Sequence, residues 1–536
     1  MNNIQNQKPC VVETPQGFSV SYKERFLYSK YNPSKTIINT IQNLSLLPNT
    51  VFLCISPVLP HGVNELISKL PESCLIVFVE LDNNLYKLSK EKLSAYLNNE
   101  NVIYPTPDEL LNLPILLFNK NTKGQYKRVV RIDFSAGVQF NQPFYDELTS
   151  VCTNNIMTFW KNRITLTKFG RKYSHNFFTN LSLLSKSLPI TNFFNAIEKP
   201  ILVFGAGQSL DTFLEHNKLD FSKFYILCVD TALQPLLKRK IIPDGVFIEE
   251  AQNVISKAFI GCLNNNVHLF AGLSSLPAIP RLRKEKTFSF FTTEYANTEF
   301  LSELKSSSFL PPVNKPYGSV GITTVYYALK FRKDNSIPVY VTGLDFSYSV
   351  GLTHGKETLA NNQRLSSANR LSPANNYTAA FGSSAVKIKD KKQNIFITTP
   401  SLQSYANIFD NLFAGTSNLF DASESGIKLS IESGTPANPT CANDNRIKTD
   451  NYTASQIEEL NTYLLREKQD LEHLKALLTG KEKLPEYELQ NEIKKIAERK
   501  DYLYLHFPDG YCFNYSQSFL NRIRTEIDYF IHRHFL

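Results

Sequence analysis

The chain has 536 residues and a mass of 61.1 kDa, which is too long for one compact core, so we expect several domains. Hydrophobic residues make up 42% and charged residues 20% of the chain, and this composition excludes global disorder. With 58 Lys and Arg against 49 Asp and Glu, the net charge is +9. That bias favours anionic ligands but is too weak for a dedicated nucleic-acid-binding protein.

The cysteines and the N-terminus predict a reduced, cytoplasmic protein. The eight cysteines lie far apart and form neither C-x-x-C pairs nor Cys/His clusters with zinc-ligand spacing, so we expect reduced thiols in the core. The first residues, MNNIQNQKPC, lack the apolar core of a signal peptide, and the longest apolar runs have only the length of a strand. We therefore expect a cytoplasmic location without membrane insertion.

Residues 1–150 have the pattern of a Rossmann-like domain. TVFLCIS (Thr50–Ser56) and CLIVFVE (Cys74–Glu80) are apolar, β-branched runs, and the GVNELISKL between them has a helical pattern. Consecutive buried strands with a crossover helix predict a parallel sheet. Three further runs are expected to extend it: Asn101–Tyr104, Ile115–Phe118 and Val129–Ser135. An aromatic, mixed-charge stretch then predicts a helical connector over residues 151–195.

A second α/β domain is expected over residues 196–445. It opens at Lys199–Leu210 (KPILVFGAGQSL), where an apolar strand runs into glycines and then a helix. Later strands are expected at Phe224–Asp230, Gly245–Glu249, Val267–Gly272 and Pro338–Phe346. Residues 361–393 are too long and polar for an ordinary connection and are either a mobile lid or a solvated insertion.

Residues 446–536 predict a helical domain. Thr453 and Gln456 have the spacing of a capping box, and leucines and isoleucines then recur at steps of three and four residues. Gly480 and Pro485 are expected to end this helix, and two more helices follow. The leucine seam predicts either a hairpin packed on its own chain or a dimer zipper, so the oligomeric state stays open.

The strongest local signal is the turn Gly205-Ala206-Gly207-Gln208-Ser209-Leu210 between a strand and a helix. Small residues there let backbone N–H groups and the helix N-terminus approach a phosphate. Leu210 occupies the third glycine position of G-x-G-x-x-G, so the dinucleotide fingerprint is incomplete. A tight turn without a ligand is the alternative.

Polar residues follow several predicted strands, at the edge where open α/β sheets bind ligands. They are Asp230 and Thr231 after one strand, Glu249, Glu250 and Gln252 after another, and Gly343, Asp345 and Phe346 after a third. Gly318 and Ser319 precede a helix, in a position that suits a phosphate, a carboxylate or a simple N-cap. His354 lies in a polar stretch just beyond Asp345 and is either a general base or an ordinary surface histidine.

Six segments resemble, in this order, the motility-associated factor (Maf) glycosyltransferases, which modify bacterial flagellin. They are LYSKYNPSKTI near residue 27, FGAGQSLD at 204, VDTALQPLLKRKIIPDGVFIEEAQ at 229, KPYGSVGITTVYYALKF at 315, PVYVTGLDFSYSVGLTHGKET at 338 and FDASESGIKLSIESGTP at 420. The resemblance covers most of the chain. It implies two Rossmann-like α/β domains, an N-terminal methyltransferase-like sheet and a central sialyltransferase-like variant of the GT-A fold, with a C-terminal helical domain.

The resemblance also implies roles for particular residues. Donor binding is expected from Gly205, Gly207, Ser209 and Leu210 at the phosphate and ribose, from Asp230 and Gln252 along the cytidine pocket, and from Ser319 and Thr323 near the donor carboxylate. Ala206, Thr231, Gly318 and Gly343 are expected to bind the donor as well. Asp345, Tyr348 and His354 are expected to face the departing phosphate or the acceptor hydroxyl. Gln208 stands where the family more often has proline.

The implied activity is O-glycosylation of flagellin Ser or Thr by inverting displacement from a CMP-activated nonulosonic acid of the pseudaminic, legionaminic or sialic type. No metal site is expected, because the chain has no Asp-x-Asp pair, and no cofactor is expected to stay bound. In the N-terminal domain, the turn at Ser56–Gly62 has two prolines and no G-x-G, so scaffolding or acceptor binding is expected there rather than cofactor binding.

Two alternatives remain. A related archaeal pterin pyrophosphokinase shares the central fold and would require ATP, Mg²⁺ and a pterin pocket. A non-enzymatic flagellin-binding or chaperone protein would bind flagellin without binding CMP.

Overall fold

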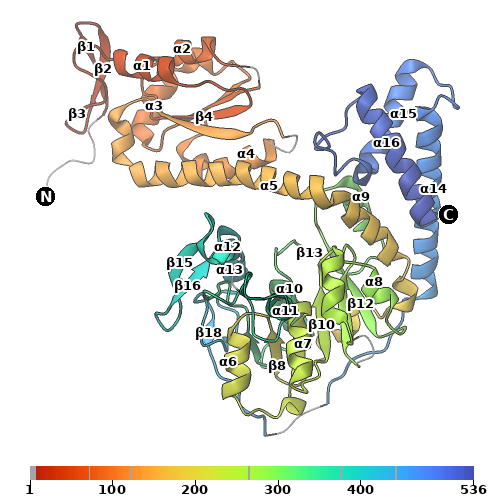
Figure 1. The fold of residues 1–536 in the computed structure, drawn as a ribbon. Helices are drawn as coiled ribbons and strands as arrows, with labels where there is room; N and C mark the ends of the chain where they lie inside the picture. Colours follow the sequence, from red (N-terminus) through yellow and green to blue (C-terminus); the bar gives the residue numbers. More distant parts are fainter. Residues whose placement is uncertain are drawn as a thin grey trace. The chain divides into compact units, whose positions relative to one another are not determined.

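The computed structural model divides the chain into two compact units, which we describe separately (Figure 1). Unit 1 is residues 1–169 with 505–513, and unit 2 is residues 170–504 with 514–536. The structure describes residues 8–71, 73–120, 124–262, 266–374, 377–440 and 444–535. The 40-residue helix α5 (Gln142–Leu181) passes from one unit to the other, so the chain divides differently from the four predicted segments 1–150, 151–195, 196–445 and 446–536.

Unit 1 contains a parallel four-stranded sheet in the order β6-β5-β4-β7 and an antiparallel three-stranded sheet β1-β2-β3. Its strands are β1 (Cys10–Thr14), β2 (Gly17–Tyr22), β3 (Arg25–Phe26), β4 (Thr50–Ile55), β5 (Leu75–Val79), β6 (Val102–Ile103) and β7 (Arg128–Asp133). Its helices are α1 (Lys35–Asn43), α2 (Val63–Ser68), α3 (Asn83–Lys92), α4 (Leu113–Lys120) and the first part of α5. The predicted parallel sheet is confirmed, whereas the short β1-β2-β3 sheet was not predicted.

Alternation along β4 builds a core on each face of this parallel sheet. Val51 and Leu53 point to the face that α4 and α5 cover, and Phe52 and Cys54 point to the face that α1 and α2 cover. A strand that is buried on both faces has a continuous apolar sequence, without alternation of polar and apolar residues. The run TVFLCI therefore predicts a strand of this kind.

The strand predicted at Ile115–Phe118 is wrong, because these residues lie in the helix α4. Leu110, Leu113 and Leu117 recur at steps of three and four residues and are buried, whereas Ile115 is exposed. A short apolar run is compatible with either a strand or one helical face, and here the capping box of Thr106 with Glu109 starts a helical path that leads into α4.

Unit 2 is built on a nine-stranded sheet in the order β13-β12-β11-β10-β9-β8-β14-β17-β18, and every pairing in it is parallel. Its strands are β8 (Ile201–Phe204), β9 (Tyr225–Val229), β10 (Gly245–Ile248), β11 (His268–Gly272), β12 (Phe288–Thr293), β13 (Val313–Asn314), β14 (Val339–Thr342), β17 (Leu419–Asp421) and β18 (Glu432–Ser433). Strand numbers rise outward from β8 in one direction and from β14 in the other. The order therefore reverses between β8 and β14, the switch point where such sheets bind ligands.

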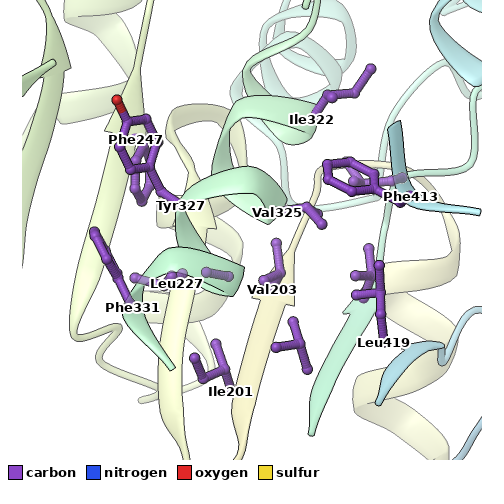
Figure 2. Close-up of a cluster of buried hydrophobic side chains, with 14 of the residues drawn as sticks. Ile201, Val203, Leu227, Phe247, Ile322, Val325, Tyr327, Phe331, Phe413 and Leu419 are labelled. Carbon is purple, nitrogen blue, oxygen red and sulfur yellow. The ribbon is translucent and has the colours of Figure 1, made fainter. Parts of the chain in front are cut away.

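Helix α10 (Val320–Phe331) packs across the middle of this sheet, and Figure 2 shows the core that it forms. Tyr327 stacks on Phe247 of β10, with ring centroids 5.6 Å apart, and Phe331 lies 5.1 Å from the ring of Phe270. The remaining helices of the sheet region are α6 (Ser209–His216), α7 (Asp230–Lys238), α8 (Ala278–Arg281) and α9 (Glu299–Leu304). This core fixes the positions of the strand ends that carry the predicted site.

A small group of elements is inserted between β14 and β17. It comprises α11 (Leu359–Ser366), α12 (Tyr377–Phe381), the antiparallel pair β15 (Val386–Lys389) and β16 (Ile395–Thr398), and α13 (Pro400–Phe413). The predicted polar segment 361–393 thus contains helices and a strand. Its role as a lid or as a solvated insertion stays a prediction.

Three C-terminal helices complete unit 2: α14 (Ala454–Leu478), α15 (Glu486–Arg499) and α16 (Gln517–Phe530). The capping box of Thr453 with Gln456 is confirmed, and α14 ends just before Gly480. Leu460, Leu471 and Leu474 are buried against neighbouring helices of the same chain, which favours a hairpin over a dimer zipper.

The described cysteines agree with the prediction of reduced thiols. Seven of them are free, and five of these seven are buried: Cys54, Cys74, Cys152, Cys228 and Cys262. Cys441 lies outside the described residues. Nowhere in the described chain does a helix combine the length and the apolar character that crossing a membrane demands.

We expect the stability of unit 2 to depend on pH because of His268, a partly buried histidine at the start of β11. Its ring lies 4.8 Å from the rings of Phe193 and Phe270, its Nε2 lies 2.9 Å from Ser289 Oγ, and burial lowers its pKa to about 3. The ordinary pKa is about 6.5, so the unfolded chain binds the extra proton first as the pH falls. The stabilising contribution of neutral His268 is therefore complete above about pH 6.5 and is lost as the pH falls towards 3.

We expect His268→Gln to remove this dependence. Relative to the variant, the wild type should lose about 1.4 kcal/mol of unfolding free energy per pH unit below about pH 6. Urea unfolding of both proteins at several pH values between 7.5 and 5 measures the difference, and it also cancels the contributions of other titrating groups. Parallel pH curves would contradict the assignment.

Candidate active site at the carboxyl edge of the central sheet

The predicted glycine turn lies at the switch point, directly against the chain that follows β14. A Cβ on Gly205 would lie 2.2 Å from the carbonyl oxygen of Gly343, and a Cβ on Gly207 would lie 2.5 Å from Asp345 Oδ2. Gly343 has φ +76, which glycine adopts without strain. The glycines therefore permit a close approach of two loops.

Several backbone N–H groups of this turn bond within the chain. Gly205 N donates to Thr342 O and Gly207 N to Gly343 O, both at 2.8 Å, and Leu210 N donates to Gly207 O at 3.2 Å. A phosphate at this turn would have to compete with these bonds. The predicted donor-binding role of the turn stays a prediction.

Ser209 and Asp345 form a buried pair beneath the turn. Asp345 Oδ2 accepts from Ser209 N at 2.9 Å, Asp345 Oδ1 accepts from Ser209 Oγ, and Ser209 Oγ accepts from Gly343 N at 2.9 Å. Burial raises the pKa of Asp345 to about 6, although the bonds from Ser209 and the nearby Lys391 oppose this rise. Both carboxylate oxygens are engaged, so Asp345 fixes the β14 loop to the start of α6.

An ion pair between a lysine and a buried aspartate, which the sequence did not predict, lies near Asp345. Lys391 of the inserted elements pairs with the buried Asp421 at the end of β17, and Asp421 Oδ1 also accepts from Ser423 N at 2.9 Å. Asp421 falls in the FDASES segment and could have been found there as a strand-end acid, whereas Lys391 lies in a lysine-rich loop without any distinguishing signal.

On the other side of the switch point, the acids Asp230, Glu249 and Glu250 follow β9 and β10. Glu249 accepts from Thr293 Oγ1 and from Thr323 Oγ1, each at 2.7 Å, and burial raises its pKa. Asp230 is buried, and its Oδ1 accepts from Thr231 Oγ1 at 2.6 Å. Burial, with smaller contributions from Glu249 and Glu250, raises the pKa of Asp230 to about 6.

Three other predicted residues lie around these acids. Gln252 N donates to Glu250 Oε1 at 2.8 Å. Gly318 has φ +77 and precedes Ser319, the N-cap of α10, whose hydroxyl makes no capping bond. Together with Thr323 these residues belong to the edge on which β9, β10 and α10 meet.

The loop that carries His354 is bound to the glycine turn. Gly355 N donates to Ala206 O at 2.9 Å, Lys356 N to Asp211 Oδ2 at 2.6 Å, and Gln208 Nε2 to Ser349 Oγ at 2.7 Å. Gln208 stands where the Maf proteins more often have proline, and its side chain anchors this loop. Asp211 was not predicted, and it also pairs with Arg239 at 2.9 Å.

His354 and Tyr348 do not meet the buried acids. His354 is exposed, and its Nδ1 lies 3.3 Å from Thr353 Oγ1. The hydroxyl of Tyr348 donates to Ala379 O at 2.8 Å, so this side chain holds the inserted elements together. The structure thus brings Asp345 into the site region but leaves the predicted catalytic trio apart.

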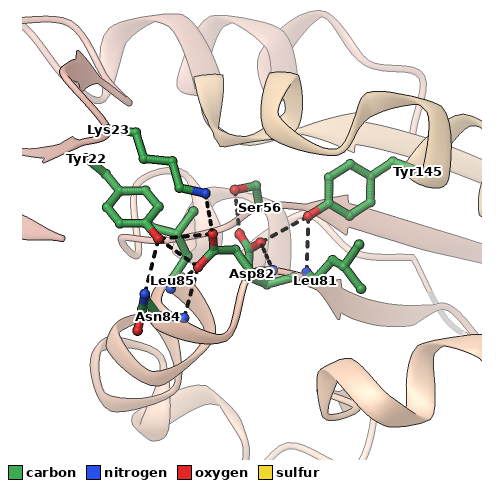
Figure 3. Close-up of polar contacts among 9 residues, drawn as sticks. Tyr22, Lys23, Ser56, Leu81, Asp82, Asn84, Leu85 and Tyr145 are labelled. Carbon is green, nitrogen blue, oxygen red and sulfur yellow. Dashed lines mark hydrogen bonds and ion pairs between the residues drawn. The ribbon is translucent and has the colours of Figure 1, made fainter. Parts of the chain in front are cut away.

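Figure 3 shows the corresponding edge of the sheet in unit 1. Buried Glu80 accepts from Ser56 Oγ at 2.6 Å and from Tyr145 Oη and Asp82 N at 3.0 Å, and burial raises its pKa. Asp82 pairs with Lys23 at 2.9 Å. Glu80 and Asp82 are thus both engaged inside unit 1, which favours the predicted scaffolding role.

Unit 2 has cavities away from the carboxyl edge. One of about 630 Å³ lies among α9, α14 and α15, and one of about 650 Å³ lies at the opposite edge of the sheet, near Lys199 and Asp244. Within the described residues, no group of three or more His, Cys, Asp or Glu side chains is arranged to hold a metal ion. Donor binding without a metal stays a prediction.

Strand order, the glycine turn at the switch point and the surrounding acids define a Rossmann-type α/β protein with its candidate site at the carboxyl edge. The family model "6-hydroxymethylpterin diphosphokinase MptE-like" matches residues 171–351, which include most of this edge. An uncharacterized protein of Treponema pallidum (strain Nichols) is 30% identical over 551 residues, covering 99% of this chain and 95% of the relative. The chain belongs to the same family as this protein.

A solved structure shows the same fold. The Maf glycosyltransferase from Magnetospirillum magneticum AMB-1 is similar with a TM-score of 0.56 and 12% identity, and the match covers 98% of this chain and 91% of that one. This likeness confirms the predicted α/β fold class, and it confirms the resemblance to Maf proteins as far as the fold is concerned.

Proposed function

We propose that the protein is a glycosyltransferase. The observation that carries this proposal is the extent of the likeness to the Maf glycosyltransferase, which covers 98% of the chain and not just a nucleotide-binding sheet. A Rossmann-type sheet alone serves many unrelated activities, whereas a likeness that extends over nearly the whole chain narrows the range of possible activities.

The donor that we propose is a CMP-activated nonulosonic acid, and the acceptor is a Ser or Thr hydroxyl of flagellin. The hydroxyl oxygen would attack the anomeric carbon while the bond to the CMP phosphate breaks, which inverts the configuration. Preorganised donors would stabilise the charge on the leaving phosphate. Ser319 is the best placed of the predicted donor-binding hydroxyls, because it begins α10 without a capping bond, whereas Thr323 is committed to Glu249.

A second candidate is a pterin diphosphokinase. The observation that favours it is the MptE-like match over residues 171–351. That activity would require ATP and Mg²⁺, so nucleotide preference separates the two candidates.

Calorimetric titration of the full chain with CMP, and separately with ATP plus Mg²⁺, tests the proposal. We expect saturable binding of CMP and a rise in melting temperature with CMP concentration, because a ligand that binds only the folded state stabilises it. Binding of ATP with Mg²⁺ alone would favour the diphosphokinase. Binding of neither nucleotide would favour a non-catalytic flagellin-binding role.

A further inference from the structure

The acids along the carboxyl edge of unit 2 differ in how completely their oxygens are bonded. Both oxygens of Asp345 accept from Ser209, and both oxygens of Glu249 accept from threonine hydroxyls. Asp421 is paired with Lys391. These three carboxylates are held in fixed structural contacts, so none of them is free to exchange a proton with a substrate.

Asp230 and Glu250 are bonded less completely. Glu250 is half-buried and accepts from Gln252 N at 2.8 Å. Asp230 is 5% exposed, and among the described residues its carboxylate is bonded only by the neighbouring Thr231, through the hydroxyl on Oδ1 and the main-chain N–H. Among the described residues no lysine, arginine or histidine pairs with it. A buried carboxylate without a cation costs stability, and such costs concentrate at functional sites.

The position of Asp230 suits a reaction at the switch point. It follows β9, the strand next to β8, so it and Asp345 lie on opposite sides of the glycine turn that follows β8. Neighbouring strands lie about 4.8 Å apart, so a ligand seated across this turn would reach Asp230.

We propose that Asp230 is the general base of the glycosyl transfer, in place of His354, and not a contact of the cytidine pocket. This inference rests on the proposed function. Asp230 would accept the proton of the acceptor hydroxyl as that oxygen bonds to the anomeric carbon. The electron pair of the breaking carbon–oxygen bond would leave with the CMP phosphate, so charge and atoms balance.

The electrostatic surroundings of Asp230 agree with this role. The charged groups that face it are Glu249 and Glu250, which follow β10, and the titratable Cys228 lies two residues earlier, in β9. Burial and these two acids raise its pKa to about 6. A base with a pKa near the working pH combines a large deprotonated fraction with good proton affinity.

Asp230→Asn tests the inference in the full chain. The wild type is first tested with CMP-pseudaminic, CMP-legionaminic and CMP-N-acetylneuraminic acid as donors and flagellin as acceptor. With the donor that the wild type uses, we expect the kcat of the variant to be lower by about 100-fold or more. The dissociation constant for CMP should stay within about threefold, because the variant keeps the size and shape of the side chain. The melting temperature should stay equal or rise, because an uncompensated buried charge is removed. The acidic limb of the wild-type kcat–pH profile, near pH 6, should disappear.

Asp244→Asn is the matched control, because it makes the same change at the opposite edge of the same sheet, where Asp244 Oδ2 accepts from Ile226 N at 2.7 Å; its kcat should stay near that of the wild type. Unchanged kcat in Asp230→Asn, or a fall that accompanies a lower melting temperature, would overturn the inference. So would loss of the acidic limb in His354→Ala but not in Asp230→Asn. If the wild type neither binds CMP nor transfers a sugar, the proposed function itself fails, which is a distinguishable result.

Discussion

Replacing Lys500 with alanine is expected to lower the free energy of unfolding of unit 2 by about 3–5 kcal/mol. Lys500 is 3% exposed and pairs with Glu467 and, at 3.0 Å, with Asp470. Glu467 is 1% exposed and also accepts from Tyr502 Oη at 2.6 Å. Without Lys500 the carboxylate of Glu467 would be buried without a cation, and that penalty exceeds the attraction that the pair contributes. Urea unfolding followed by circular dichroism measures the loss.

Lys494→Ala in α15, the helix that ends just before Lys500, is the matched control. Lys494 lies 3.9 Å from Glu498 at the surface, and such exposed pairs contribute about 0.5 kcal/mol or less. A small, equal effect of both substitutions would show that the Lys500 pair is not buried in solution. The double variant Lys500→Met with Glu467→Leu should recover most of the stability, because it removes both charges and fills the space.

Several elements could be predicted from the sequence because one physical signal dominated each of them. β4 and β5 are continuous apolar runs, as expected of strands that helices cover on both faces. The capping box at Thr453 predicted the start of α14, and α16 is one of the two further helices expected after it. α4 was misassigned because four apolar residues in a row fit a strand or a helix.

The candidate site was only partly predictable. Strand ends such as Asp230 and Asp345 could be found, because the carboxyl edge of a parallel sheet collects them. The bond of Ser209 to Asp345 joins residues 136 positions apart and depends on the pairing of β8 with β14, which no local pattern encodes. Tyr348 is predicted to act in catalysis, but its backbone forms a β-bridge with Ile397 of β16 and its hydroxyl donates to Ala379 O.

The close approach at the switch point makes Gly205→Ala the second large effect that we expect. Its Cβ would lie 2.2 Å from the carbonyl oxygen of Gly343, which is backbone and cannot rotate away, and 2.5 Å from a methyl carbon of Leu344. Overpacking of this kind costs about 3 kcal/mol when the neighbour cannot move. Separation of the two loops would also break the 2.8 Å bond from Gly205 N to Thr342 O. Thermal and urea unfolding measure the loss.

Gly272→Ala at the end of β11 separates this steric effect from the general effect of replacing a glycine. The nearest atom to a Cβ there is a ring carbon of Phe291 at 3.4 Å, an ordinary contact, so we expect a change within about 1 kcal/mol. If both variants are equally stable, the loops after β8 and β14 are not packed together in solution. If Gly205→Ala alone is destabilised, the two loops form one rigid base for the site, and the acids on either side of the glycine turn keep a fixed separation.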